Sequence, residues 1–123
     1  VASDNERAIG AFIGATLAGA AGLSRETRER TRHKELLFGM YVPQAHRRLG
    51  LGRALVQAVL ADAAAWPGLR VVQLTVTDGN DAAQRLYEAC GFRVFGVEPM
   101  ALCIERRALA KVHMWVAIDS ERA

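Results

Sequence analysis

The sequence is short of cysteine and of the residue clusters that hold metal ions. Cys90 and Cys103 are its only cysteines in 123 residues, and no histidine or acidic cluster accompanies them at the spacing of a zinc site. Two scattered cysteines cannot form the disulfide framework of a small secreted domain. We therefore expect no bound metal and a reducing compartment, the cytoplasm.

Long hydrophobic runs are also scarce. Residues 8–23 are uncharged, but this stretch is shorter than the ~20 residues that a bilayer requires, and its glycines disfavour a helix in water. Acidic Asp4 and Glu6 stand where a signal peptide carries positive charge. The run instead predicts two strands of small residues, residues 9–17 and 20–24, joined near Ala18 and Gly19.

A strong charge imbalance is missing too. The net charge is +3, and five basic side chains against two acidic ones in residues 24–34 account for all of it. No aromatic interleaving, zinc finger or helix-turn-helix pattern accompanies this basic stretch, which disfavours a nucleic-acid partner. We interpret it as a solvated loop between two strands. The length predicts one domain over residues 1–123.

The most informative stretch that is present is a glycine-containing loop between a strand and a helix. Residues 36–42 predict a strand that Pro43 ends, and an alanine-rich helix begins near Gly52 and continues to Trp66-Pro67-Gly68. Glycine lacks a Cβ, and the first amides of a helix have no partner within the helix. Such a loop can therefore bind phosphate.

Two common phosphate-binding loops do not fit these residues. A nucleotide-binding P-loop ends in Gly-Lys-Ser or Gly-Lys-Thr, whereas this one ends in Gly52-Arg53-Ala54. A dinucleotide fingerprint requires a third glycine, where Leu55 stands, and an acid about twenty residues later, and Asp78 is too distant. The remaining pattern is R-x-x-G-x-G, from Arg47 to Gly52.

The second half of the chain predicts one more parallel unit and then antiparallel strands. Residues 71–77 predict a strand parallel to residues 36–42, with the helix as the crossover. A short helix then begins at Asn80 or Asp81 and ends at Gly91, which places Asn80 and Tyr87 on one face. Strands are expected at residues 92–97, 100–104 and 111–118, with a turn at 105–107.

The patterns Arg47-x-x-Gly50-x-Gly52 and Leu86-Tyr87-Glu88-Ala89-Cys90-Gly91-Phe92, with Asn80 between them, closely resemble the GCN5-related N-acetyltransferase (GNAT) family. The resemblance covers most of the chain. It implies an α/β fold, with a mixed, mostly antiparallel sheet and flanking helices on both sides. It also implies acetyl-CoA as co-substrate and an amine-bearing acceptor.

The resemblance further implies roles for single residues. Tyr87 is the expected catalytic acid, which protonates the departing thiolate, and an amide near Met40 or Val42 would hold the oxyanion. Gly39, within this strand, indicates either a bulge or a packing contact. Glu35 is the nearest candidate base, but a solvated glutamate at a strand end is favoured. The expected acetyl-CoA-binding residues are Met40, Tyr41, Val42, Arg47, Arg48, Leu49, Gly50, Leu51, Gly52, Arg53, Asn80 and Tyr87.

One departure from the family concerns the start of the chain. Family members normally begin with another strand and two helices that wall the acceptor pocket, and the sequence begins at Val1 without them. We therefore expect an exposed sheet edge at the first strand, which pairs with a second copy in a homodimer or belongs to a longer chain. A noncatalytic acetyl-CoA-binding module and a basic nucleic-acid adaptor are the alternative functions.

Overall fold

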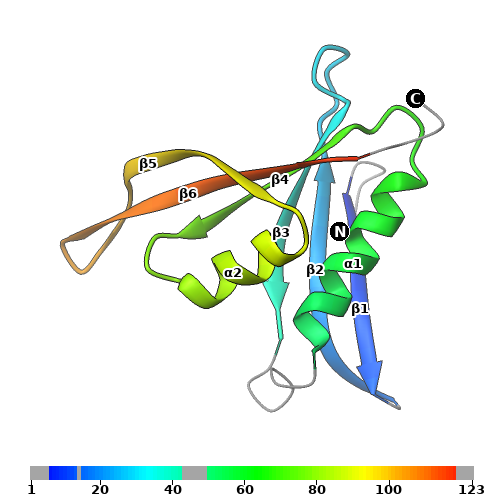
Figure 1. The fold of residues 1–123 in the computed structure, drawn as a ribbon, viewed down its shortest axis with the longest axis horizontal. Helices are drawn as coiled ribbons and strands as arrows, with labels where there is room; N and C mark the ends of the chain where they lie inside the picture. The colour runs from blue at the N-terminus through cyan, green and yellow to red at the C-terminus, as the bar shows by residue number, and fades with distance from the viewer. Residues whose placement is uncertain (1–5, 14, 43–49, 119–123) are drawn as a thin grey trace.

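A computed structural model describes residues 6–13, 15–42 and 50–118, which form a mixed six-stranded sheet with two helices (Figure 1). The strand order is β1-β2-β3-β4-β6-β5. Only β3 and β4 pair in parallel within this described part, as predicted. The elements are β1 (Glu6–Ile13), β2 (Thr16–Arg25), β3 (Lys34–Tyr41), α1 (Leu51–Ala64), β4 (Val71–Thr77), α2 (Asp81–Ala89), β5 (Arg93–Ile104) and β6 (Arg107–Ala117).

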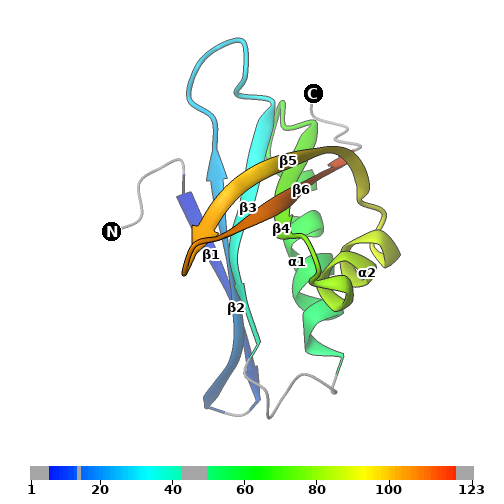
Figure 2. The same ribbon diagram turned by 90° about the vertical axis from the view of Figure 1, so that its left-hand side faces the viewer.

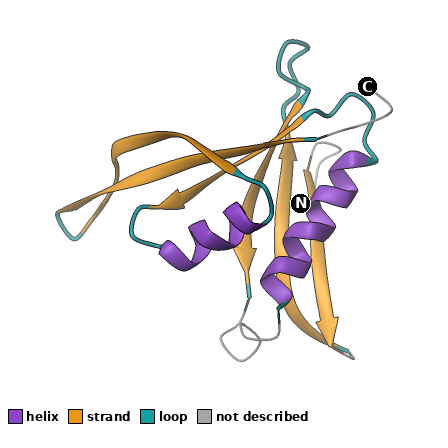
Figure 3. Cartoon of the chain, in the orientation of Figure 1, coloured by secondary structure: helices purple, strands orange, loops and turns teal. Residues whose placement is uncertain are grey.

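Both helices pack on the same face of the sheet (Figures 2 and 3). Leu55, Val56 and Val59 of α1 are buried at helical spacing. Val56 and Val59 belong to the same apolar cluster as Tyr87 of α2. Fully burying one such aliphatic side chain contributes about 1.5–3 kcal/mol. The expectation of helices on both sides is thus wrong for the described residues, because the two helices share a single core.

The first two strands are joined earlier than predicted. Ala15 lies in the turn, and β2 runs straight through Ala18 and Gly19. A Cβ on Gly19 would lie 2.7 Å from the Leu55 side chain of α1. This glycine therefore permits close packing of the helix, where the sequence suggested a turn. Along the described sheet, β1 is an edge strand.

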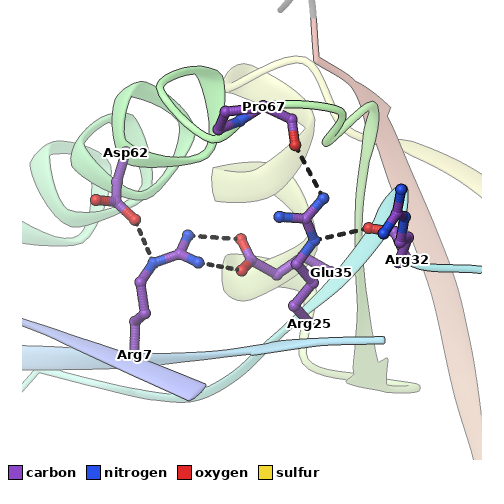
Figure 4. A network of polar contacts seen from close by, with 6 residues as sticks. All are labelled: Arg7, Arg25, Arg32, Glu35, Asp62 and Pro67. Carbon is purple, nitrogen blue, oxygen red and sulfur yellow. Dashed lines mark hydrogen bonds and ion pairs between the residues drawn. The ribbon is translucent and has the colours of Figure 1, made fainter. Parts of the chain in front are cut away.

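The basic stretch forms the loop between β2 and β3, as predicted. Most of its side chains are exposed. Arg25 is an exception, since its guanidinium donates hydrogen bonds to the carbonyl oxygens of Arg32 at 2.7 Å and Pro67 at 3.0 Å (Figure 4). Arg25 therefore ties this loop to the chain segment that follows α1.

The end of the described chain is a long hairpin. The two predicted pieces, 92–97 and 100–104, form the single strand β5, whose pairing with β6 shifts between Glu98 and Leu102. Glu105 and Arg106 form the two-residue turn with φ of 49° and 67°. Positive φ at both positions matches the right-handed twist of the hairpin strands.

The described helices include none that is long and apolar enough to span a membrane.

Candidate functional site

The sheet divides between β3 and β4. Their parallel pairing extends only from Lys34↔Val71 to Leu36↔Gln73, after which the strands diverge (Figure 1). On its other side, β3 carries an extra residue, because the four residues from Phe38 to Tyr41 lie opposite the three residues from Ala20 to Gly22 of β2. Gly39 has φ +60°, and a Cβ there would meet nothing within 4 Å. Gly39 therefore serves a bulge rather than a packing contact.

A cleft of about 750 Å³ lies between the separated strands and reaches the starts of both helices. Its walls from β3, α1 and α2 include most of the predicted binding residues. Leu51 does not line it, and Arg47, Arg48 and Leu49 lie outside the described residues. The predicted residues that line the cleft are Met40, Tyr41, Val42, Gly50, Gly52, Arg53, Asn80 and Tyr87.

The sequence reasoning missed the wall that β4 contributes. Leu74, Thr75, Val76 and Thr77 all line the cleft. These residues follow the point where β4 loses its pairing with β3. The possible bulge at Gly39 could have identified them, because a bulge in one strand separates it from the parallel strand beside it.

The start of α1 is suited to an anion. Gly50 precedes the helix with φ +73°, and no side chain caps it. The first intrahelical bond runs from the Ala54 amide to the Gly50 carbonyl at 3.1 Å, so the amides before Ala54 have no partner within the helix. The first turn carries no acidic side chain, and Arg53 adds a positive charge at the cleft. Both features favour negative charge at this end of the helix.

Gly52 has a structural reason of its own. A Cβ at this position would lie 3.1 Å from the Leu86 side chain of α2. Gly52 thus permits the close approach of the two helices, besides facing the cleft. A Cβ on Gly50 would meet no other atom within 4 Å, so only the positive φ at this position favours glycine.

Tyr87 lies between the cleft and the core. Its side chain is buried, and its ring meets Phe92 edge-on with centroids 5.7 Å apart. Burial, with a smaller contribution from Cys90, raises the pKa of the phenol above 10.0. The phenol is therefore protonated at neutral pH and can act as a proton donor.

Of the two predicted starts of α2, Asn80 and Asp81, it is Asn80 that caps the helix. Its side-chain oxygen accepts a hydrogen bond from the Ala83 amide at 3.3 Å. It also lines the cleft two helical turns before Tyr87. Contact of Asn80 with a bound ligand stays a prediction.

The cleft holds a proton donor but no evident proton acceptor. Its lining, within the described chain, contains no aspartate, glutamate or histidine. The ionisable side chains there are Arg53 and the two tyrosines, Tyr41 and Tyr87. The described lining therefore supplies no base for this site.

Glu35 is paired with Arg7 and does not line the cleft, and the expectation of a solvated glutamate is wrong. Its side chain is only 1% exposed, and the two carboxylate oxygens contact Nη1 and Nη2 of Arg7 at 2.7 and 3.0 Å (Figure 4). Arg7 Nε also contacts Asp62 at 2.7 Å, and its guanidinium lies 4.1 Å from the Trp66 ring centroid. The carboxylate of Glu35 thus belongs to an ion-pair network that joins β1, β3 and α1, outside the lining of the cleft.

Comparison with known proteins gives consistent results. A model of the Acetyltransferase (GNAT) family matches residues 1–92. N-alpha-acetyltransferase RimI of Mycobacterium tuberculosis is 36% identical over 97 residues, which is 79% of this chain and 58% of that protein. N-alpha-acetyltransferase 40 of Saccharomyces cerevisiae is 42% identical over 62 residues, or 46% of this chain and 22% of the relative. The chain therefore spans less than two thirds of both curated relatives.

Among solved structures, a GNAT acetyltransferase from Streptococcus pneumoniae superimposes with a TM-score of 0.87. It is 32% identical, and the match covers 94% of this chain and 69% of that one. This agreement confirms the predicted fold.

Proposed function

Because the chain belongs to the GNAT family of acetyltransferases, we propose that it transfers an acetyl group from acetyl-CoA to a primary amine. The amine attacks directly, in a ternary complex. The observation that carries this proposal is the cleft between β3 and β4, which connects the anion-suited start of α1 to the buried phenol of Tyr87. A single N-acetyltransferase domain over residues 1–123 is part of the proposal.

The cleft fits an elongated ligand with phosphate at one end. Gly50, Gly52 and Arg53 would hold the pyrophosphate, together with residues 47–49, which lie outside the described part. The bulged segment around Met40 would face the acyl group, where a backbone amide stabilises negative charge on the carbonyl oxygen. Acetyl-CoA supplies the thioester, and Tyr87 supplies a proton to the leaving sulfur.

The acceptor class is proposed from the relatives. RimI and N-alpha-acetyltransferase 40 are named for the α-amine of a protein N-terminus, so peptide N-termini are the first acceptors to test. Small-molecule amines and lysine side chains are the further classes. The cytoplasmic location stays a prediction, and so does a homodimer through the β1 edge, which light scattering would detect as twice the 13.4 kDa chain mass.

Release of coenzyme A is the test of the proposed function. The protein is incubated with acetyl-CoA and heptapeptide pools that differ in their first residue, and with a lysine-containing peptide whose N-terminus is blocked. Acetylation of one pool well above the rate without acceptor is the expected result. Tight binding of acetyl-CoA with no acceptor-dependent release would support the alternative, a noncatalytic acetyl-CoA-binding module, and absence of binding would contradict both.

Gly50→Val is expected to weaken acetyl-CoA binding at least about tenfold. The valine strains a backbone with φ +73°, and its branched side chain occupies the space that a pyrophosphate requires. Isothermal titration calorimetry measures the affinity. Gly52→Val should also weaken binding at least about tenfold, but that substitution additionally presses on Leu86.

Gly50→Asn is the matched control for this prediction, because asparagine tolerates positive φ better than other residues with a Cβ. Weak binding in Gly50→Asn would indicate that the side chain obstructs the site, whereas normal binding would indicate that Gly50→Val acts through backbone strain. A folded Gly50→Val protein with unchanged affinity would remove the start of α1 from the binding site.

A further inference from the structure

A histidine and a glutamate form a pair on the strand next to the cleft. His113 on β6 is the Cα partner of Thr75 on β4, and its Nε2 lies 2.9 Å from Oε1 of Glu98 on β5. Val112 and Met114, the chain neighbours of His113, belong to the core under the helices. His113 therefore lies on the opposite face of the sheet, and its side chain is partly exposed.

This pair is close to the cleft because Thr75 lines the cleft. Directly opposite residues of an antiparallel pair have Cβ atoms about 4.5–5.5 Å apart, with both side chains on one face. The imidazole of His113 thus lies one strand from the cleft, on the face without a described helix. An amine that enters from that face would reach the imidazole through a bridging water molecule.

The surroundings of the cleft leave few other groups for this task. Its described lining has no carboxylate and no histidine, and Glu35 is held by both outer nitrogens of Arg7. An amine must lose a proton before it can attack a thioester, because its ordinary ammonium form has no free electron pair. Imidazole is the side chain best suited to accept a proton near neutral pH.

We propose that His113, oriented by Glu98, is the base that deprotonates the acceptor amine through one water molecule. This inference rests on the proposed function. The carboxylate of Glu98 accepts a hydrogen bond from Nε2–H, which selects the tautomer whose Nδ1 carries a free electron pair. Glu98 is a positioning residue, and it also stabilises the imidazolium that forms.

The proton balance of the reaction follows from these roles. The first proton leaves the ammonium nitrogen through water to His113 and then passes to the solvent. The neutral nitrogen forms a bond to the carbonyl carbon of the thioester, and the carbon–sulfur bond breaks. Tyr87 protonates the departing thiolate, and the second proton from the nitrogen restores the phenol. The products are the amide, coenzyme A and one proton.

The charges that face His113 come from two strands. On β5, Glu98 is the carboxylate in contact, and Phe95 lies against the imidazole with centroids 5.8 Å apart. On β6, Lys111 is two residues away on the same face and is the Cα partner of Glu98. From β4, Thr75 brings no charge. Lys111 thus competes for Glu98, and the orientation of His113 depends on that carboxylate.

The test compares His113→Gln with the wild-type protein on two matched acceptors. One is the heptapeptide that the wild-type protein acetylates best, and the other is the same peptide with its α-amine replaced by an aminooxy group, which is neutral at pH 7. The kcat/KM for the α-amine peptide should fall about 10²-fold, because general-base catalysis contributes 10²–10⁴. The aminooxy peptide needs no deprotonation, so its kcat/KM should change little.

The pH profile supplies a second readout. In His113→Gln the kcat/KM should follow the neutral fraction of the free peptide α-amine, whose ordinary pKa is about 7.7–8.0, whereas in the wild-type protein it should stay high to lower pH and decline where the base is lost. Glu98→Gln should shift that decline and lower the rate less than His113→Gln. His33→Gln, the same substitution in the loop between β2 and β3, is the control and should behave like the wild-type protein.

The outcomes separate this inference from the function on which it rests. A wild-type protein that acetylates no amine overturns both. An active wild-type protein with an equally active, folded His113→Gln variant overturns the base alone. Equal losses on the two acceptors also overturn it, because they indicate a structural role. If His113→Gln does not fold, an unshifted pH profile in Glu98→Gln overturns the assignment of His113 as the base.

Discussion

Replacing Arg7 by methionine is expected to lower the free energy of unfolding by about 3–5 kcal/mol. Methionine retains much of the aliphatic packing but removes the guanidinium that contacts both carboxylate oxygens of Glu35. The buried carboxylate then has no partner, and leaving a buried charge uncompensated is more costly than losing the interaction itself. Urea unfolding followed by circular dichroism measures the change.

The destabilisation by Arg7→Met should grow with pH. In the folded protein burial raises the pKa of Glu35 above 4.5, and the nearby Arg7 partly opposes this increase. A carboxyl with a raised pKa contributes stability at pH values below its unfolded pKa, and this contribution is lost as pH rises through the folded value. Without Arg7 the folded pKa rises further, so the variant should lose more stability at about pH 7 than at about pH 5.

Two further variants separate the effect of the buried Arg7–Glu35 ion pair from that of the more exposed Arg7–Asp62 contact. Asp62 contacts Arg7 from a partly exposed position, so Asp62→Asn should destabilise by about 1 kcal/mol or less. The double variant Arg7→Met/Glu35→Leu should recover most of the stability, because an apolar pair replaces the buried charges. A double variant as unstable as Arg7→Met would mean that the loss arises from the arginine's packing on Trp66.

Tyr87→Phe is expected to lower kcat about 10²-fold while acetyl-CoA affinity changes little. The substitution keeps the ring and its edge-on contact with Phe92 but removes the proton that the leaving thiolate requires. Steady-state kinetics with the best heptapeptide, together with calorimetry for acetyl-CoA, measure the two quantities separately.

Phe92→Leu is the packing control for this prediction, because it disturbs the ring contact and retains the phenol. It should lower thermal stability more than Tyr87→Phe and kcat less. Loss of both kcat and affinity in Tyr87→Phe would indicate that the residue supports the shape of the cleft. Wild-type turnover in that variant would make water the acid.

The parts of the fold predicted correctly are those that depend on neighbouring residues. The strand predicted at residues 71–77 is β4 to the residue, because Val72, Leu74 and Val76 alternate within it. The predicted alanine-rich helix is α1, whose buried residues recur at helical spacing. The start of α2 followed from the capping preference of Asn80. Each of these signals lies within a single strand or within two turns of one helix.

The errors concern contacts between residues far apart in sequence. Arg7 meets Glu35 across 28 positions and Asp62 across 55, and nothing near Glu35 in sequence indicates such a partner. Gly19 was interpreted as a turn because its contact with Leu55 belongs to a helix thirty-odd residues later. Gly39 left two interpretations open, and only its backbone angle and empty surroundings decided between them.

The site was predicted as far as its motifs extend. Gly50, Gly52 and Tyr87 do line one cleft, because both helices approach the place where β3 and β4 separate. Thr75 and its neighbours on β4 belong to no motif and were missed. The pairing of His113 with Glu98 depends on the register of β5, which shifts twice and could not be derived from local pattern.

The short pairing of β3 with β4 has a mechanical consequence. Three residue pairs join the two halves of the sheet, and Glu35 is one of the six residues involved. From Leu36 to Tyr41, β3 extends about 16 Å beyond this seam at about 3.3 Å per residue. With that lever arm, a rotation of about 5° at the seam displaces the tip by about 1.4 Å. Torsion at the seam, where Arg7 braces Glu35, would therefore change the aperture beside Tyr41 at the other end of the strand.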